Sequence, residues 1–127
     1  MSHIVTIQTR IRDRQALEAA CRRLKLPSAK EATVDFFSGS VHGWAVELPG
    51  WVYPVVVDPA SGQLHYDNYE GRWGQEQELH RLLQAYAVEK AKLEARRQGY
   101  RCHEILLSNG TIRLELSPWD EDASEIS

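Results

Sequence analysis

Residues 54–66, Pro54-Val55-Val56-Val57-Asp58-Pro59-Ala60-Ser61-Gly62-Gln63-Leu64-His65-Tyr66, predict a β-hairpin in the middle of the chain. The run of three valines is typical of a short buried strand. The next five residues form a strong turn signal, and Leu64 and Tyr66 share one face of a second strand. Because proline cannot donate a ladder hydrogen bond, Pro54 predicts that the first strand begins there or lies at a sheet edge.

The segment before this hairpin predicts a strand, a helix and a further hairpin. Apolar residues alternate over 3–11, which is the period of a half-buried strand. Asp13 is expected to cap a helix that runs to about Leu26, because Pro27 follows. Alternating apolar residues around 34–36 and 44–48, with a turn at 38–40, predict the two strands of the hairpin.

The segment after the central hairpin predicts a long helix and a closing hairpin. The helix is expected over about 75–98, with Gly99 just beyond its end. Residues 101–107 are expected to pair with 111–116 around Asn109-Gly110. The apolar stripe predicted for the long helix consists of Leu79, Leu82, Leu83, Tyr86 and Leu93.

This order, β-α-ββ-ββ-α-ββ, predicts an α+β fold. Helices interspersed with hairpins favour an antiparallel sheet of about five to seven strands with two helices packed on one face. The length of 127 residues suits one domain, which we expect over 1–117, followed by a flexible acidic tail over 118–127.

Composition and charge exclude several classes of protein. The chain is 43% hydrophobic and no run of residues reaches the 18–20 apolar residues that a membrane-spanning helix needs, so no membrane association is expected. Residues 1–116 carry 15 basic and 14 acidic side chains, and near-neutrality makes nucleic acid an unfavourable partner. Two cysteines and polar residues among the first dozen indicate reduced thiols and a cytoplasmic protein.

Both ends of the chain carry short motifs that are similar to those of a known family. The motifs are Met1-Ser2-His3-Ile4-Val5-Thr6-Ile7-Gln8-Thr9, Ile11-Arg12-Asp13, Ala16-Leu17, Leu83-Gln84-Ala85-Tyr86-Ala87, Gly99-Tyr100 and Asn109-Gly110-Thr111-Ile112-Arg113-Leu114. The chain thereby resembles domain of unknown function 1257, a family of small conserved proteins that includes a plastid-encoded reading frame. The resemblance implies a fold outline and carries no established activity.

The sequence offers one candidate metal site. His65 and Asp67 are two residues apart on a strand, so their side chains share a face. Glu76 and His80 are four apart on a helix and also share a face. Two imidazoles and two carboxylates would suit a first-row transition metal. The alternative is an ordinary polar sheet face and helix start, and we expect no cofactor.

Aromatic residues concentrate between positions 44 and 73. Core packing absorbs some of them, and the others would form an exposed patch of the kind that binds protein partners. Tyr69, Arg72 and Trp73 are the candidate partner-binding residues, since aromatic and arginine side chains dominate binding hot spots. Packing of Trp73 between helix and sheet is the alternative.

These features favour a non-enzymatic interaction or regulatory module that binds an unknown protein partner. We assign no catalytic residue. A small metal-binding protein or metal-dependent enzyme is the alternative, and an RNA-associated module is a further one. A basic cluster of Arg96, Arg97 and Arg101 at the end of the long helix fits favourable charges at a helix C-terminus.

Overall fold

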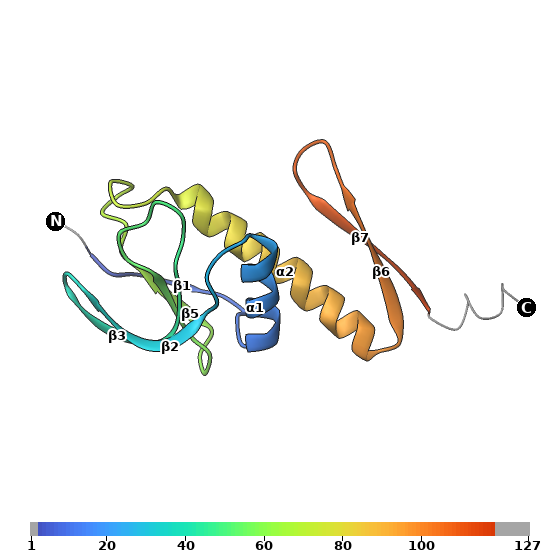
Figure 1. Ribbon diagram of the computed structural model, residues 1–127, viewed down its shortest axis with the longest axis horizontal. Helices are drawn as coiled ribbons and strands as arrows, with labels where there is room; N and C mark the ends of the chain where they lie inside the picture. Colours follow the sequence, from blue (N-terminus) through green and yellow to red (C-terminus); the bar gives the residue numbers. More distant parts are fainter. Residues whose placement is uncertain (1–2, 119–127) are drawn as a thin grey trace, which may run out of the picture. The chain divides into compact units, whose positions relative to one another are not determined.

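The computed structural model of the protein describes residues 3–118 (Figure 1). It confirms the α+β class and the predicted order of helices and strands. The predicted acidic tail lies outside the described residues, apart from Pro118, which ends the last strand. The elements are β1 (Val5–Gln8), α1 (Arg14–Arg23), β2 (Lys30–Phe36), β3 (Gly39–Val46), β4 (Val55–Asp58), β5 (Gln63–Tyr66), α2 (Glu76–Arg97), β6 (Tyr100–Leu106) and β7 (Ile112–Pro118).

The strands form two antiparallel sheets. Five of them pair in the order β1-β5-β4-β3-β2, and β6 pairs with β7 in a separate two-stranded sheet. The chain divides into two compact units between Tyr86 and Ala87, within α2. The first unit holds the five-stranded sheet and α1, and the second holds the hairpin of β6 and β7. The single domain over 1–117 stays a prediction.

The valine run forms β4, the central strand of the larger sheet. The strand begins at Val55, directly after Pro54, so the proline stands outside the hydrogen-bond ladder and the edge-strand alternative does not apply. Val55, Val56 and Val57 each have 0% of their surface exposed. Successive side chains of a strand point to opposite faces, so both faces of the sheet are covered at β4.

One face of β4 belongs to the main core. Val55 pairs with Val46, and Val57 pairs with Leu64, so these four buried side chains lie on the same face. Trp44 is also on this face, because it pairs with Val57, and the guanidinium of Arg14 on α1 lies 6.0 Å from its ring. The helix α1 therefore covers this face and contributes its buried side chains: Ala16, Leu17, Ala20 and Cys21.

The opposite face of β4 carries a second hydrophobic cluster. Val56 packs there with Val34 and Phe36 of β2. Partly buried side chains pack against this cluster: Ile4, Val41, Ala45 and Tyr53. Among residues 3–118, the side chains of this cluster come from strands and loops and none from a helix, so these exclude water from this side of the sheet.

The helix α1 has both ends fixed by hydrogen bonds. The carboxylate of Asp13 accepts bonds from the backbone N–H groups of Gln15 (3.0 Å) and Ala16 (3.2 Å), as its predicted role as N-cap requires. The helix ends at Arg23, earlier than the predicted Leu26. The Leu26 N–H donates to the Cys21 carbonyl while Lys25, with φ of 59°, reverses the chain, as in a Schellman motif.

The helix α2 buries a different set of side chains from the predicted stripe, because Ala85, Val88 and Ala95 are buried as well and Leu93 is only half-buried. Leu79, Leu82 and Tyr86 are buried, whereas Leu83 is only half-buried. The Tyr86 hydroxyl accepts from the backbone N–H groups of Arg12 (3.3 Å) and Asp13 (3.2 Å), which ties α2 to the start of α1. Within residues 3–118, neither helix is both long and apolar enough to cross a membrane.

In the second unit, a charged pair joins α2 to the hairpin. The Lys92 ammonium lies 2.7 Å from the Glu104 carboxylate of β6 and 3.4 Å from that of Glu89. The hydrogen bond that Lys92 donates to Glu104 raises the pKa of Lys92 despite its partial burial. Gly99, with φ of 86°, ends α2 as predicted and allows β6 to begin at once.

Truncation of α2 side chains tests this stripe. Leu82→Ala is expected to lower the free energy of unfolding by about 2–5 kcal/mol, because it empties a fully buried site. Leu83→Ala should cost less than half as much. Urea unfolding followed by circular dichroism measures both variants, and an equal or larger loss for Leu83→Ala would contradict the orientation of the helix.

The two free cysteines should differ in reactivity. Cys21 is buried, and its burial raises the pKa of the thiol, while Cys102 is only half-buried. A raised pKa keeps Cys21 in the unreactive thiol form at pH 8. Iodoacetamide is therefore expected to label Cys102 at least about tenfold faster than Cys21, as followed by peptide mass spectrometry. Equal rates in the native protein, rather than only in urea, would contradict the packing of α1.

Candidate functional site

The loop between β5 and α2, residues 67–74, is closed on itself by Asn68. The carbonyl of this buried residue accepts from the backbone N–H groups of Gly71 (3.1 Å) and Trp73 (2.8 Å). Its side-chain amide donates to the carbonyl of Gly74 at 3.1 Å. Three hydrogen bonds from one residue fix the loop as a compact turn before α2 begins.

The backbone of this loop is held in an uncommon conformation. Tyr69, Glu70 and Gly71 have φ values of 47°, 54° and 94°. Left-handed backbone is costly for residues other than glycine and persists where the surrounding structure enforces it. Here the bonds to Asn68 enforce it, and the resulting turn brings the rings of Tyr69 and Trp73 to a centroid distance of 4.7 Å.

Four aromatic rings form a continuous row from the sheet to this loop. Phe36 contacts Tyr53 at 5.3 Å, Tyr53 contacts Trp73 at 5.8 Å, and Trp73 contacts Tyr69. The first two pairs meet edge to face, which is a favourable geometry for aromatic rings. We call Phe36, Tyr53, Trp73 and Tyr69 the aromatic row. Phe36 is buried, whereas the other three are half-buried.

Arg72 extends the row at its exposed end. Its guanidinium carbon lies 5.2 Å from the centre of the Tyr69 ring, within the range of a cation–π contact. Stacking restricts the side chain and leaves the edge of the guanidinium, with its N–H groups, open to a ligand. Arg72 has no carboxylate partner among residues 3–118, so its charge is available for one.

An apolar side chain and a shallow groove adjoin the row. Val52 is 61% exposed, and its N–H donates to the Trp73 carbonyl at 2.9 Å. An open groove of about 470 Å³ runs past Arg72. It is lined by Pro49, Gly50, Gly71, Arg72, Gly74, Gln75 and Glu78. The predicted partner-binding residues Tyr69, Arg72 and Trp73 are thus adjacent on one surface of the molecule.

The structure does not bring together the four residues predicted to bind a metal. His65 bonds to Thr6 of β1 through Nδ1 at 2.8 Å, and Asp67 is buried and accepts from the Tyr69 N–H. Glu76 and His80 lie exposed on α2. Over residues 3–118, no three histidine, cysteine, aspartate or glutamate side chains cluster closely enough to hold a metal ion.

The strand alternation places His65 on one face of the five-stranded sheet. His65 pairs with Val56, so it lies on the sheet face of the second cluster, opposite Tyr66. Burial, with a smaller contribution from the nearby Glu76 carboxylate, raises the pKa of Tyr66. The strand β5 ends at Tyr66, so Asp67 lies in the following loop and not on the predicted strand, whereas Glu76 and His80 both lie on α2 as predicted.

The packing of Trp51 on the loop gives a test of its rigidity. A Cβ atom added at Gly74 would lie only 2.4 Å from the Trp51 ring, whose Nε1 donates to the Gln75 carbonyl. Gly74→Ala is therefore expected to lower the free energy of unfolding by about 1–3 kcal/mol.

Gly71→Ala is the matched control, because a Cβ atom there meets nothing within 4 Å and the cost comes from the positive φ alone. We expect it to cost about 1 kcal/mol, the usual penalty for left-handed backbone. Thermal unfolding compares the two variants, and a smaller loss for Gly74→Ala would mean that Trp51 does not pack on the loop.

Comparisons of the chain with protein-family models, with curated proteins and with solved structures find no match. The resemblance to domain of unknown function 1257 therefore stays a prediction.

Proposed function

We propose that the protein is a non-enzymatic interaction module of the cytoplasm that binds a protein partner through Tyr69, Arg72 and Trp73. These three residues, with the adjoining Val52, are called the partner surface below. The observation that carries the proposal is the contact of Arg72 with the face of the Tyr69 ring and of the Tyr69 ring with that of Trp73, held on a loop closed by hydrogen bonds.

Preorganisation supports binding in preference to a purely structural role. A stacked arginine and two half-buried rings lose little conformational entropy when a partner covers them. A loop that only covered the sheet would gain nothing from an exposed arginine without a carboxylate partner. The partner we infer presents a carboxylate to the guanidinium edge and an apolar side chain to Val52 and the rings.

The metal-dependent alternative lacks comparable support. His65, Asp67, Glu76 and His80 would need to meet, and among residues 3–118 no three such side chains cluster closely enough to hold a metal ion. A measurement of the metal content of the purified protein tests this alternative independently of any partner.

Variants of the partner surface test the proposal. Arg72→Ala and Tyr69→Ala should leave the melting temperature within a few degrees of the parent protein and weaken partner binding at least about tenfold, as hot-spot residues do. The measurement is quantitative affinity capture from cells of the source organism, with the retained partner identified and its binding then repeated with the purified component.

Two exposed residues serve as matched controls. Phe37 is an aromatic residue that is 72% exposed and takes no part in the aromatic row, and Arg81 is an exposed arginine on α2. Phe37→Ala and Arg81→Ala should retain the same partner at parental affinity. Equal loss in the control variants, or unchanged binding in Arg72→Ala and Tyr69→Ala, would refute the proposed surface.

A further inference from the structure

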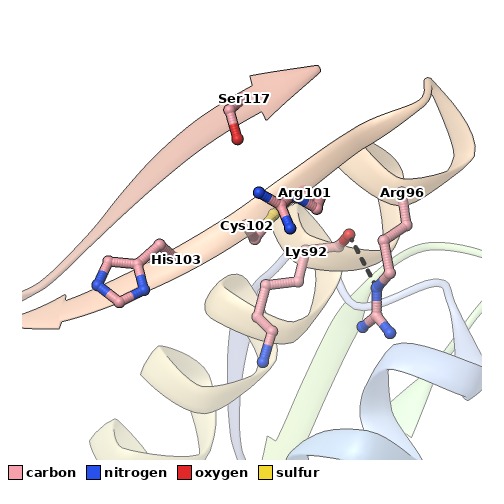
Figure 2. A pocket seen from close by; sticks show the side chains of 6 residues that line it. All are labelled: Lys92, Arg96, Arg101, Cys102, His103 and Ser117. Atoms are coloured by element: carbon pink, nitrogen blue, oxygen red, sulfur yellow. Dashed lines mark hydrogen bonds between the residues drawn. The ribbon is translucent and has the colours of Figure 1, made fainter. Parts of the chain in front are cut away.

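The hairpin of the second compact unit ends in a strand whose outer edge is unpaired. The strands β6 and β7 form a two-stranded sheet, and among residues 3–118 no third strand joins it. Glu104 of β6 pairs with Lys92 of α2, so β6 is the strand next to the helix and β7 is the outer one. Figure 2 shows the two strands where Ser117 of β7 lies opposite Arg101 of β6, both among the residues that line a cavity of about 520 Å³.

A free outer edge of this kind is a site for strand addition. Two strands by themselves form a sheet of marginal stability, and further strands stabilise it. An edge strand also presents backbone N–H and C=O groups that can pair with a strand of another chain. The question is therefore which strand the outer edge of β7 accepts.

The hydrogen-bond pattern of the hairpin shows which backbone groups lie at that edge. The Leu107 N–H donates to the Thr111 carbonyl at 2.8 Å, so these two residues form a hydrogen-bonded pair. Hydrogen-bonded and non-hydrogen-bonded pairs alternate along antiparallel strands, so Arg113 and Glu115 turn their backbone groups toward β6. The residues whose backbone groups turn to the outer edge are Ile112, Leu114 and Leu116.

The side chains of β7 divide in the same way between the two faces. Ile112, Leu114 and Leu116 share the apolar face, and 54% of Leu116 is exposed. Arg113 and Glu115 share the other face, where the guanidinium lies 3.4 Å from the carboxylate and both side chains are more than half exposed. An ion pair this exposed is weak, so both charges can also pair with charges of another strand.

The order of these charges is complementary to itself. Antiparallel pairing of β7 with the β7 of a second copy can be centred on residue 113, 114 or 115. The first register places two arginines directly opposite each other and the last places two glutamates, and like charges in these positions are destabilising. Centred on Leu114, the pairing places each Arg113 opposite the Glu115 of the second copy.

We propose that the outer edge of β7 pairs with the same edge of a second copy, in antiparallel register centred on Leu114, to form a symmetric dimer. Each copy then contributes two strands to a four-stranded sheet. Leu114 pairs with its equivalent, and Ile112 pairs with the Leu116 of the second copy, so these residues exchange backbone hydrogen bonds. The exposed Leu116 gains an apolar neighbour. The dimer uses no residue of the partner surface and does not depend on the proposed function.

Sedimentation equilibrium of the full chain tests the dimer. One pair of strands makes a small interface, so we expect a monomer–dimer equilibrium with a dissociation constant of about 10–100 µM. Arg113→Glu places acidic side chains opposite each other and should raise this constant at least about tenfold. Arg81→Glu makes the same change of charge on α2 and should change it less than about twofold. A monomer at about 1 mM, or equal effects of the two variants, would overturn the proposal.

Mixing two charge variants tests the register and separates lost pairing from misfolding. Arg113→Glu alone and Glu115→Arg alone each place like charges opposite each other and should both be monomers at about 100 µM. In an equimolar mixture, each acidic side chain of one variant lies opposite a basic side chain of the other. We expect the mixture to dimerise with about the parental dissociation constant, and a mixture that stays monomeric would overturn the register.

A disulfide at the symmetry axis gives a second measure of the register. In a Cys102→Ser background, Leu114→Cys places two thiols on residues that pair directly, with Cα atoms about 5.5 Å apart and within reach of a disulfide. Ile112→Cys is the matched control on the same face, because its two copies lie about 13 Å apart along the strands. Oxidation should cross-link Leu114→Cys at least about tenfold faster, and equal rates would overturn the proposed pairing.

Discussion

Burial of both faces of β4 is the constraint on which the first compact unit depends. Val55 and Val57 require one apolar layer and Val56 requires another, and all three side chains are fully covered. The helix α1 meets the first requirement through an apolar stripe. The second is met without a helix, by Val34 and Phe36 and by side chains from loops, Tyr53 among them. The loops of this unit are therefore structural as well as exposed.

The candidate site follows from this constraint. The aromatic row begins at Phe36, which is buried against Val56, and ends at Tyr69, where Arg72 stacks on the exposed side. One end of the row covers the sheet and the other end faces solvent. Trp73 therefore has a packing contact with Tyr53 on one side and a contact with Tyr69, a proposed binding residue, on the other. The two roles considered for Trp73 from the sequence are compatible with each other. The packing of the inner rings fixes the position of the outer ones.

Local patterns in the sequence predicted the elements well, because caps, turns and alternation act over a few residues. Asp13, Gly99 and the valine run all have the expected roles. The end of α1 was predicted too late, since a lysine rather than a glycine adopts the left-handed position there.

Features that depend on tertiary pairing could not be predicted in this way. Whether His65 and Glu76 meet depends on how helix and sheet pack, and the sequence indicates only which residues within one strand or one helix share a face. The contribution of Val52 to the site was not predicted, although the density of aromatic residues from 44 to 73, Tyr53 among them, indicated the region. The position of Ser117 opposite Arg101 likewise follows from the pairing of β6 with β7.

Native-state hydrogen exchange of the loop amides tests the central claim, that residues 67–74 are held in a fixed conformation that presents Arg72 and Tyr69. The N–H groups of Gly71 and Trp73 both donate to the Asn68 carbonyl. Both should exchange at least about a hundredfold more slowly than in an unstructured peptide, while the loop tip between them stays accessible. Exchange of both amides at the unprotected rate would contradict the account, because a mobile loop could not hold the stacked surface ready for a partner.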